Sequence, residues 1–342
     1  MAKADTQQTE EISSNTSGVE GASVLVAIPT LNEADHIEKC IRSLITDDDR
    51  IQKAKFVVAD GGSTDATCET VRELQTEFAN LHLIANPKKL QSAAINQVAR
   101  DQREAQHTCL IRCDAHADYP KGFVMAIADS LAEKQSASVV VCMDAVGKTN
   151  CFQKANAWVV DTPLGSGGAA HRGGAKSGYV DHGHHAGFNL SWFDTVAGYD
   201  ERFSHNEDAE LDQRLTAAGG KIWLNADVRL DYFPRDKITS LARQYYSYGR
   251  GRAKTIAKHK ARLKLRQLAP IVILIACVAG LLLSPVYPWA LLAPIGYGLL
   301  LTAASLWGCA SMNSPCGVLA GPAAGTMHIA WATGFIHQRL NR

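Results

Sequence analysis

The chain has 342 residues, of which 46% are hydrophobic and 20% are charged, and its formal net charge is +1. This length is enough for one large α/β domain with an appendage. A chain so close to neutral has no overall positive field, so we expect no nucleic acid among its partners.

Residues 1–21 predict a disordered tail. The segment is polar and rich in Thr, Gln, Ser and Glu, a composition that buries too little apolar surface to fold. It has none of the features of a signal peptide.

Strands and helices alternate over the next part of the chain. Short apolar runs predict strands over 24–28, 56–59, 82–85, 108–112 and 138–143. Apolar residues at helical spacing predict helices over 33–44, 66–78, 91–103 and 122–134. This alternation predicts an α/β fold, a mostly parallel sheet with helices on both faces. Ligands of such sheets bind beyond the carboxyl ends of the strands, where Thr30, Asn32, Asp60 and Asp114 would lie.

A segment rich in Gly and His follows at 165–187, and its length predicts a functional or mobile loop. Residues 192–203 indicate a turn region. A helix is expected over 207–218, ended by Gly219 and Gly220. Short strands at 221–224 and 228–232 would complete a domain spanning 22–236, and an amphipathic helix would follow over 238–256.

The C-terminal part combines a basic block with apolar stretches. Between Arg243 and Arg266 there is no acidic residue, and after Arg266 no charged residue occurs before Arg339. This pattern predicts a basic juxtamembrane segment (237–266) and membrane helices (267–342), with the 22–236 domain on the cytoplasmic side. The apolar stretches, 268–283, 286–306 and 317–336, allow three spans, or a spanning hairpin with an interfacial or re-entrant third segment. A buried helical domain is the remaining alternative.

Nine cysteines are scattered along the chain without a CxxC pair. We expect them to be reduced, space-filling residues of a protein that faces the cytosol, and we expect no zinc site. His182, His184 and His185 do not have zinc-ligand spacing either, and we interpret them as part of a binding loop.

Two acidic clusters carry the candidate chemistry. Asp114, His116 and Asp118 alternate on an extended segment, so their side chains could converge on Mn²⁺ or Mg²⁺. Asp118 could instead prepare the Tyr119-Pro120 turn. Glu207 and Asp208 open a helix, where they are either a catalytic base with its neighbour or simply acids favoured by the helix dipole.

In order along the chain, these motifs resemble the family 2 (GT-A) glycosyltransferases. The residues that carry the resemblance are Ile28-Pro-Thr-Leu-Asn-Glu33, Asp60, Lys88 with Gln91–Asn96, Asp114-Ala-His116 and Glu207-Asp208. At finer grain, segments 86–96, 114–120, 183–188 and 248–252 are similar to the succinoglycan glucosyltransferases of exopolysaccharide biosynthesis. The family's commonest metal motif is Asp-x-Asp, and His116 departs from it.

The resemblance implies a Rossmann-like GT-A fold and a role for each motif. Pro29, Thr30, Asn32 and Glu33 would line the nucleotide pocket and Asp60 would contact uracil, although Asp60-Gly61 could be only a turn. Lys88, Gln91 and Asp114 would approach the diphosphate, with Asp114 and His116 holding the metal. Asp208 would be the general base and Glu207 would position the acceptor. His184 and His185 would contact the acceptor, and Arg250 and Arg252 would meet a pyrophosphate or anionic membrane lipids.

The activity implied is inverting transfer of a sugar, glucose in the resembled group, from a UDP-sugar to a polyprenyl-diphosphate-linked glycan at the cell inner membrane. Three alternatives stay open. A nucleotide-dependent dehydrogenase would need a GxGxxG after the first strand, which is absent. A membrane-anchored nucleotide-binding protein without catalysis would leave Asp60, Asp114 and Asp208 without a role. A transferase acting on a simple lipid or a protein would use the same donor site.

Overall fold

The structure is a computed structural model that describes residues 18–45, 48–168, 172 and 176–341. Most of the tail predicted to be disordered, 1–17, lies outside the described residues. Ordered chain begins before residue 22, because Val19 N donates to Asp129 Oδ1 over 2.8 Å and Gly21 is buried in a 3₁₀ helix, η1 (Gly21–Ser23).

In the described part of the chain, eight strands form one sheet in the order β3-β2-β1-β4-β7-β5-β8-β6. Their bounds are β1 (Val24–Thr30), β2 (Lys55–Asp60), β3 (Leu81–Ala85), β4 (Cys109–Arg112), β5 (Ser138–Ala145), β6 (Gly178–Val180), β7 (His184–Asn189) and β8 (Ile222–Tyr232). β6 and β7 run antiparallel to their neighbours, and the other strands share one direction. The predicted mostly parallel sheet is confirmed.

Helices cover both faces of this sheet. They are α1 (Ile37–Ile45), α2 (Thr67–Glu77), α3 (Gln91–Asp101), α4 (Phe123–Lys134), α7 (Leu190–Thr195) and α8 (Glu207–Ala217), with a 3₁₀ helix η2 (Asp49–Lys53). α1, α2 and α4 pack with Val24 and Val26 of β1, whereas α3, α7 and α8 pack with Leu25 and Ala27. Successive strand residues point to opposite faces, so β1 is apolar throughout because both of its faces are buried.

The prediction of a long loop over 165–187 is wrong for the part of this segment that the structure describes. The segment contains β6 and the start of β7, and β7 lies inside the sheet between β4 and β5. The sequence of β7, His-His-Ala-Gly-Phe-Asn, lacks the apolar run that is typical of a buried strand. Gly187 fits the crowded interior, because a Cβ at this position would lie 2.6 Å from the Ile127 side chain. Residues 169–171 and 173–175 lie outside the described residues.

Two further differences are local. The predicted turn region at 192–203 begins inside α7, and the two short strands expected at 221–224 and 228–232 are one strand, β8. The pairing of β8 with β5 shifts register between Val141 and Cys142, which interrupts the regular apolar pattern in the middle of β8.

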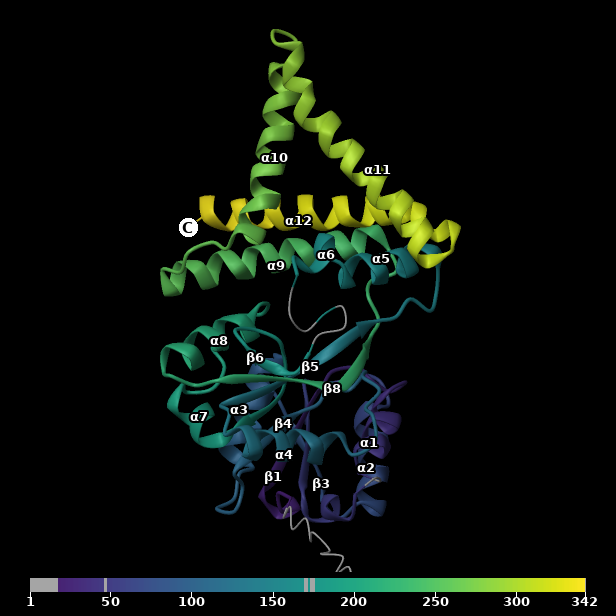
Figure 1. The fold of residues 1–342 in the computed structure, drawn as a ribbon. Coiled ribbons are helices and arrows are strands. Elements are labelled where there is room, and N and C mark those ends of the chain that lie inside the picture. The colour runs from purple at the N-terminus through teal and green to yellow at the C-terminus, as the bar shows by residue number, and fades with distance from the viewer. Residues whose placement is uncertain (1–17, 46–47, 169–171, 173–175, 342) are drawn as a thin grey trace, which may run out of the picture.

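A layer of helices lies between the sheet and a C-terminal hairpin (Figure 1). This helical layer consists of α5 (Cys151–Asp161), α6 (Pro163–Ser166), α9 (Ile238–His259) and α12 (Ala320–Leu340). β5 and β8 run towards it, so the carboxyl edge of the parallel strands faces the layer (Figure 1). The predicted amphipathic helix at 238–256 is α9, which lies side by side with α12.

The hairpin consists of α10 (Leu265–Leu283) and α11 (Leu292–Met312), joined through a 3₁₀ helix, η3 (Pro288–Leu291). Among the described residues, α10 and the segment Pro288–Met312 are the two helices long and apolar enough to cross a membrane. Their side chains are largely exposed, with Leu282 at 75% and Trp289 at 81%. The third apolar stretch forms α12, which crosses the base of the hairpin instead of extending it (Figure 1). The third apolar stretch thus does not continue the hairpin, and the number of spans and an interfacial or re-entrant place for this segment stay predictions.

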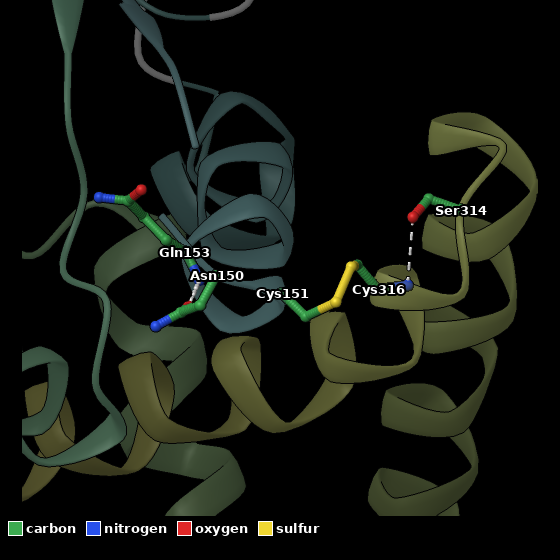
Figure 2. Close-up of a disulfide and its surroundings, with 5 residues drawn as sticks. All are labelled: Asn150, Cys151, Gln153, Ser314 and Cys316. Atoms are coloured by element: carbon green, nitrogen blue, oxygen red, sulfur yellow. Dashed lines mark hydrogen bonds between the residues drawn. A yellow bond between two sulfur atoms is a disulfide. The ribbon is translucent and has the colours of Figure 1, made fainter. Parts of the chain in front are cut away.

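The expectation that all cysteines are reduced is wrong for two of them. Cys151 and Cys316 form a disulfide, with 4.7 Å between their Cα atoms, that joins α5 to a 3₁₀ helix, η4 (Pro315–Leu319) (Figure 2). A capping side chain lies shortly before each cysteine: Asn150 Oδ1 accepts from Gln153 N, and Ser314 Oγ accepts from Cys316 N. The partners are 165 residues apart, so no sequence spacing indicates the pair.

Candidate active site

Asp60 ends β2 at the carboxyl edge of the sheet, directly beside Thr30 of β1. Its Oδ2 accepts hydrogen bonds from Gly62 N (2.8 Å) and Ser63 N (3.0 Å), and its Oδ1 accepts from Ser63 Oγ. Burial tends to raise the pKa of Asp60, but these hydrogen bonds outweigh burial and hold the pKa below its usual value. Asp60 is therefore an ionised carboxylate that also orders the turn after β2.

The segment after β1 lies against this turn. Asn32 Oδ1 accepts from Thr64 N (2.8 Å), and Asn32 N donates to Ser63 Oγ (2.8 Å). Asn32 has a φ of 55°, a left-handed conformation that Asn adopts more readily than most residues. The residues expected to line the nucleotide pocket that share this edge are Pro29, Thr30, Asn32, Glu33 and Asp60.

Asp114 follows β4 on the same edge. Gln91, the first residue of α3, donates from Nε2 to Asp114 Oδ1 over 2.5 Å. His184 Nε2 lies 3.8 Å from Asp114 Oδ2. Burial would raise the pKa of Asp114, but the positive charge of Arg112, followed by His184 and His116, lowers it. The structure thus brings Gln91, Asp114 and His184 together from three separate elements.

Arg112, at the end of β4, connects Asp114 to the second acidic cluster. Its guanidinium is buried, with 5% of the side chain exposed, and Nη1 lies 2.8 Å from Asp208 Oδ1. Its Nε lies 3.4 Å from Asp114 Oδ1. Sequence reasoning did not select Arg112. The available signal was a charged residue in an otherwise apolar strand, two residues before a candidate metal ligand, because a buried charge requires a partner.

Asp208 and Glu207 open α8 and differ in their electrostatic state. Asp208 Oδ1 accepts from Arg112 and from the Tyr199 hydroxyl (2.8 Å). Burial would raise the pKa of Asp208, but Arg112 and then His185 and His184 lower it well below its usual value. Burial, together with the neighbouring charge of Asp208, raises the pKa of Glu207 to about 7. Asp208 is ionised at neutral pH, whereas Glu207 titrates there.

His184 and His185 lie on opposite faces of β7. Burial lowers the pKa of His184 to about 4, so its ring is neutral at pH 7. His185 is fully buried: Ser138 Oγ contacts Nδ1 over 2.6 Å, and Asp212 Oδ1 lies 2.8 Å from Nε2. Asp212 belongs to α8, so His185 links β7 to the helix that begins with the acidic pair. Both histidines were expected to contact the acceptor. The position of His184 beside Asp114 makes it a candidate metal ligand instead, and we do not propose that the buried His185 touches the acceptor.

The three basic candidates make their described contacts with other residues. Lys88 is paired with Glu201 over 2.5 Å and is largely exposed. Arg250 donates from Nε to Gln338 Oε1 of α12 over 3.3 Å. Arg252 lies in α9, where burial and then Arg266 lower its pKa. None of the contacts described for these three side chains is with Asp114 or Asp208.

The donor set fits a divalent cation at Asp114. A carboxylate oxygen and a neutral imidazole nitrogen face each other, as Mn²⁺ accepts, and one or two protein ligands suffice when a diphosphate supplies the others. His116 is 64% exposed and lies 3.0 Å from Glu33 Oε1, and Asp118 is paired with Lys39 over 2.7 Å. In the described ranges no group of three or more His, Cys, Asp or Glu side chains is arranged to hold a metal by itself.

Fold and site together define a class: a glycosyltransferase with the GT-A fold. A mannosyltransferase from Pyrobaculum calidifontis, solved with GDP-Man and Mn²⁺, has this fold, with a TM-score of 0.58 at 19% identity, covering 94% of this chain and 88% of that one. The family described as Glycosyl transferase family 2 matches residues 25–196.

The chain is also similar to two curated proteins. It is 42% identical over 326 residues to the succinoglycan biosynthesis protein ExoA of Rhizobium meliloti (strain 1021), covering 93% of this chain and 96% of that protein. A dolichyl N-acetyl-alpha-D-glucosaminyl phosphate 3-beta-D-2,3-diacetamido-2,3-dideoxy-beta-D-glucuronosyltransferase of Methanococcus voltae is 25% identical over 69% of this chain and 74% of that protein. The chain belongs to glycosyl transferase family 2.

Proposed function

We propose that this glycosyltransferase transfers a sugar, glucose, from a UDP-sugar to a lipid-linked glycan in exopolysaccharide biosynthesis, with inversion at the anomeric carbon. The observation that carries the proposal is the pair of contacts by which Arg112 bridges Asp114 and Asp208. They connect the carboxyl edge of the sheet, where the sugar donor would bind (the donor edge), to the acidic pair of α8. The similarity along nearly the whole chain to a succinoglycan biosynthesis protein supports the pathway class. The polyprenyl diphosphate of the acceptor and the choice of glucose are part of the proposal.

In the proposed reaction, Asp208 is the general base. Both hydrogen bonds to its carboxylate end on Oδ1, and we assign proton acceptance to Oδ2. Oδ2 takes the proton of the acceptor hydroxyl while that oxygen forms a bond to the anomeric carbon. The bond from that carbon to the diphosphate breaks on the opposite face, and UDP leaves with the electron pair. Arg112 keeps Asp208 ionised for this step.

The residues around the leaving group have complementary roles. Asp60, with Thr30 and Asn32 beside it, would bind the uridine, and Gln91 would orient Asp114. A divalent cation held by Asp114, with His184 or His116, would neutralise the charge that develops on the departing diphosphate. Glu207, beside the base, would orient the acceptor hydroxyl.

We propose that the α10–α11 hairpin spans the inner membrane, with the catalytic domain in the cytoplasm and α9 and α12 at the membrane surface. Two apolar helices of sufficient length and the basic residues of 243–266 support this placement. Both ends of the hairpin lie on the side of the catalytic domain, which agrees with the basic residue Arg339 at the end of α12 (Figure 1).

The direct test uses the full chain in lipid nanodiscs with UDP-glucose, UDP-galactose, UDP-GlcNAc and GDP-mannose, each with Mn²⁺ or Mg²⁺. We expect release of UDP from UDP-glucose, abolition of release by EDTA, and transfer to a polyprenyl-diphosphate saccharide but not to a simple lipid or a protein. The product linkage, followed by NMR, should have the anomeric configuration opposite to that of the donor. Turnover that persists in EDTA would contradict the metal role, and retention would contradict the single displacement.

A pH dependence follows from the difference between the two acids. Glu207, with its pKa raised to about 7, is protonated below that pH, whereas Asp208, with its lowered pKa, stays ionised. If ionised Glu207 orients the acceptor, kcat/KM should rise as the pH increases through about 7 and should fall about tenfold per pH unit below it. Glu207→Gln should remove this limb of the profile. An unchanged acidic limb in Glu207→Gln would exclude Glu207 as its source.

A further inference from the structure

The start of α8, which carries the acidic pair, is held by α9 of the helical layer. Asn206 precedes α8 with a φ of 66°, and its Nδ2 donates to Thr255 Oγ1 of α9 over 2.8 Å. Gly251 of α9 lies against the same turn, because a Cβ there would come within 2.6 Å of His205 O. The backbone directly before Glu207 and Asp208 is therefore positioned by contacts with another part of the chain.

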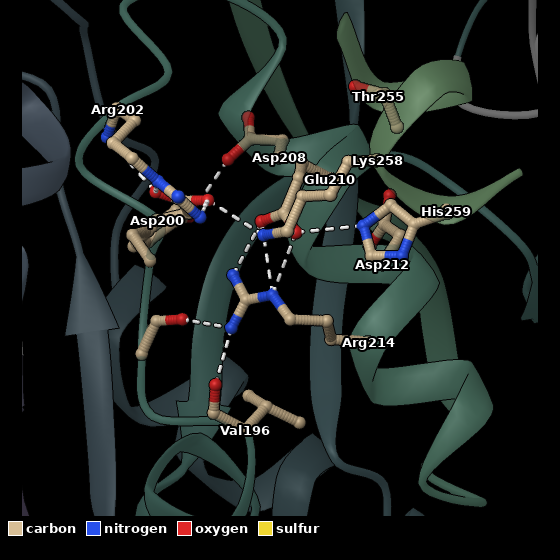
Figure 3. Close-up of polar contacts among 12 residues, drawn as sticks. Val196, Asp200, Arg202, Asp208, Glu210, Asp212, Arg214, Thr255, Lys258 and His259 are labelled. Carbon is tan, nitrogen blue, oxygen red and sulfur yellow. Dashed lines mark hydrogen bonds and ion pairs between the residues drawn. The ribbon is translucent and has the colours of Figure 1, made fainter.

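A second contact lies one turn further along α8, at Glu210. This carboxylate has no exposed surface, yet it accepts from Arg214 of its own helix and from Lys258 and His259 of α9 (Figure 3). The Lys258 Nζ atom lies 2.5 Å from Glu210 Oε1 and 2.7 Å from Asp200 Oδ2. One lysine of α9 thus joins α8 to the segment that precedes it.

The charges in this cluster are complementary. Burial would raise the pKa of Glu210, but hydrogen bonds from Arg214 and Lys258 lower it. Arg214 also donates to the carbonyls of Val196 and Gly198, and therefore holds the segment before α8 independently of α9. The part of the cluster that depends on α9 is therefore Lys258 with His259.

On its other side, α9 packs closely on α12. A Cβ on Gly249 would lie 2.0 Å from Trp331 O, and a Cβ on Gly334 would lie 2.1 Å from Tyr246 O. These glycines allow the two backbones to approach closely, so α9 and α12 pack as one unit. Contacts therefore run without interruption from α12 through α9 to the first turn of α8.

We propose that Lys258 is a positioning residue for the acidic pair, acting through Glu210 and Asp200, and that the helical layer sets the position of α8 relative to the donor edge. The proposal rests on the proposed function, because it takes Asp208 as the base. It assigns to α9 a role in the chemical step in addition to packing. Because Lys258 contacts α8 and the segment before it, and not the donor edge, its loss should lower kcat and leave donor binding unchanged.

The experiment compares Lys258→Ala, Lys258→Arg and Lys254→Ala in the full chain in nanodiscs. Lys254 lies on the same helix one turn earlier, and in the described part of the chain it makes no ion pair with α8, so it controls for loss of a positive charge. We measure kcat, KM for UDP-glucose, UDP affinity by calorimetry, and the melting temperature. We expect Lys258→Ala to lower kcat at least tenfold, with UDP affinity and the KM for UDP-glucose within about twofold of the parent values. Lys258→Arg should restore most of the lost kcat.

Gly251→Ala provides a test without any change of charge, since the added methyl would displace α9 from His205. It should lower kcat with the same unchanged UDP affinity. The inference is overturned if Lys258→Ala and Lys254→Ala have equal kcat. It is also overturned if Lys258→Ala loses kcat only in proportion to a lower melting temperature, or if Lys258→Arg restores stability but not turnover. A parent chain without transferase activity would instead contradict the proposed function.

Discussion

Replacement of Asp208 by Asn is expected to lower kcat by about 10²–10⁴-fold, the usual contribution of a positioned general base. The amide has the shape of the carboxylate, and its oxygen can still accept from Arg112 and Tyr199, so the start of α8 should be retained. UDP binding, which we assign to Asp60, Asn32 and Asp114 at the carboxyl edge of the sheet, should stay within about threefold. Steady-state kinetics and calorimetric titration with UDP would measure both effects.

Glu207→Gln is the matched control, because it neutralises the adjacent acid on the same turn. The base assignment predicts a smaller loss of kcat at pH 8 for Glu207→Gln than for Asp208→Asn. Equal activity of Asp208→Asn and the parent chain would remove Asp208 as the base. A larger loss in Glu207→Gln would transfer that role to Glu207.

Replacement of Arg112 by Met is expected to affect both stability and turnover. The guanidinium is buried between Asp114 and Asp208, and its removal leaves two carboxylates without their shared partner. Loss of one partner of a buried pair costs about 3–5 kcal/mol of unfolding free energy. Protonation of Asp208 would then become easier, so kcat should also fall by at least about tenfold. Urea unfolding and steady-state kinetics would measure the two effects.

Arg112→Lys separates charge from geometry. A lysine keeps the positive charge but lacks the forked guanidinium that contacts both carboxylates. We expect it to recover most of the unfolding free energy and only part of kcat. If Arg112→Met unfolds at the same urea concentration as the parent, the bridge does not contribute to stability in the way that the distances indicate.

The sequence was sufficient where local pattern determines structure. The apolar runs that become β1, β2 and β4 are buried on both faces, so nearly every residue in them carries the signal. Asp60 and Asp114 follow such strands, and parallel strands bring their carboxyl ends to one edge. Their common edge was therefore predictable from topology, whereas Gln91, which donates to Asp114, was selected only through the family resemblance.

The remaining features depend on contacts between distant segments. β7 lies inside the sheet although its sequence begins with two histidines. Their polar rings have partners only in the folded chain, since His184 faces Asp114 and His185 pairs with Asp212. Arg112 pairs with Asp208, which is 96 residues away, so no local pattern indicates this contact. The Cys151–Cys316 disulfide and the Lys258–Glu210 contact likewise join segments that no periodicity relates.

The orientation of the sheet towards the helical layer has a consequence for encounter kinetics (Figure 1). If the hairpin spans a bilayer as proposed, the carboxyl edge of the sheet faces the cytoplasmic membrane surface, and the proposed lipid-linked acceptor would arrive by lateral diffusion in two dimensions. The enzyme then responds to the mole fraction of that lipid in the leaflet, whereas the soluble nucleotide sugar acts through its bulk concentration. Dilution of the bilayer with inert phospholipid would therefore slow the reaction at constant total substrate.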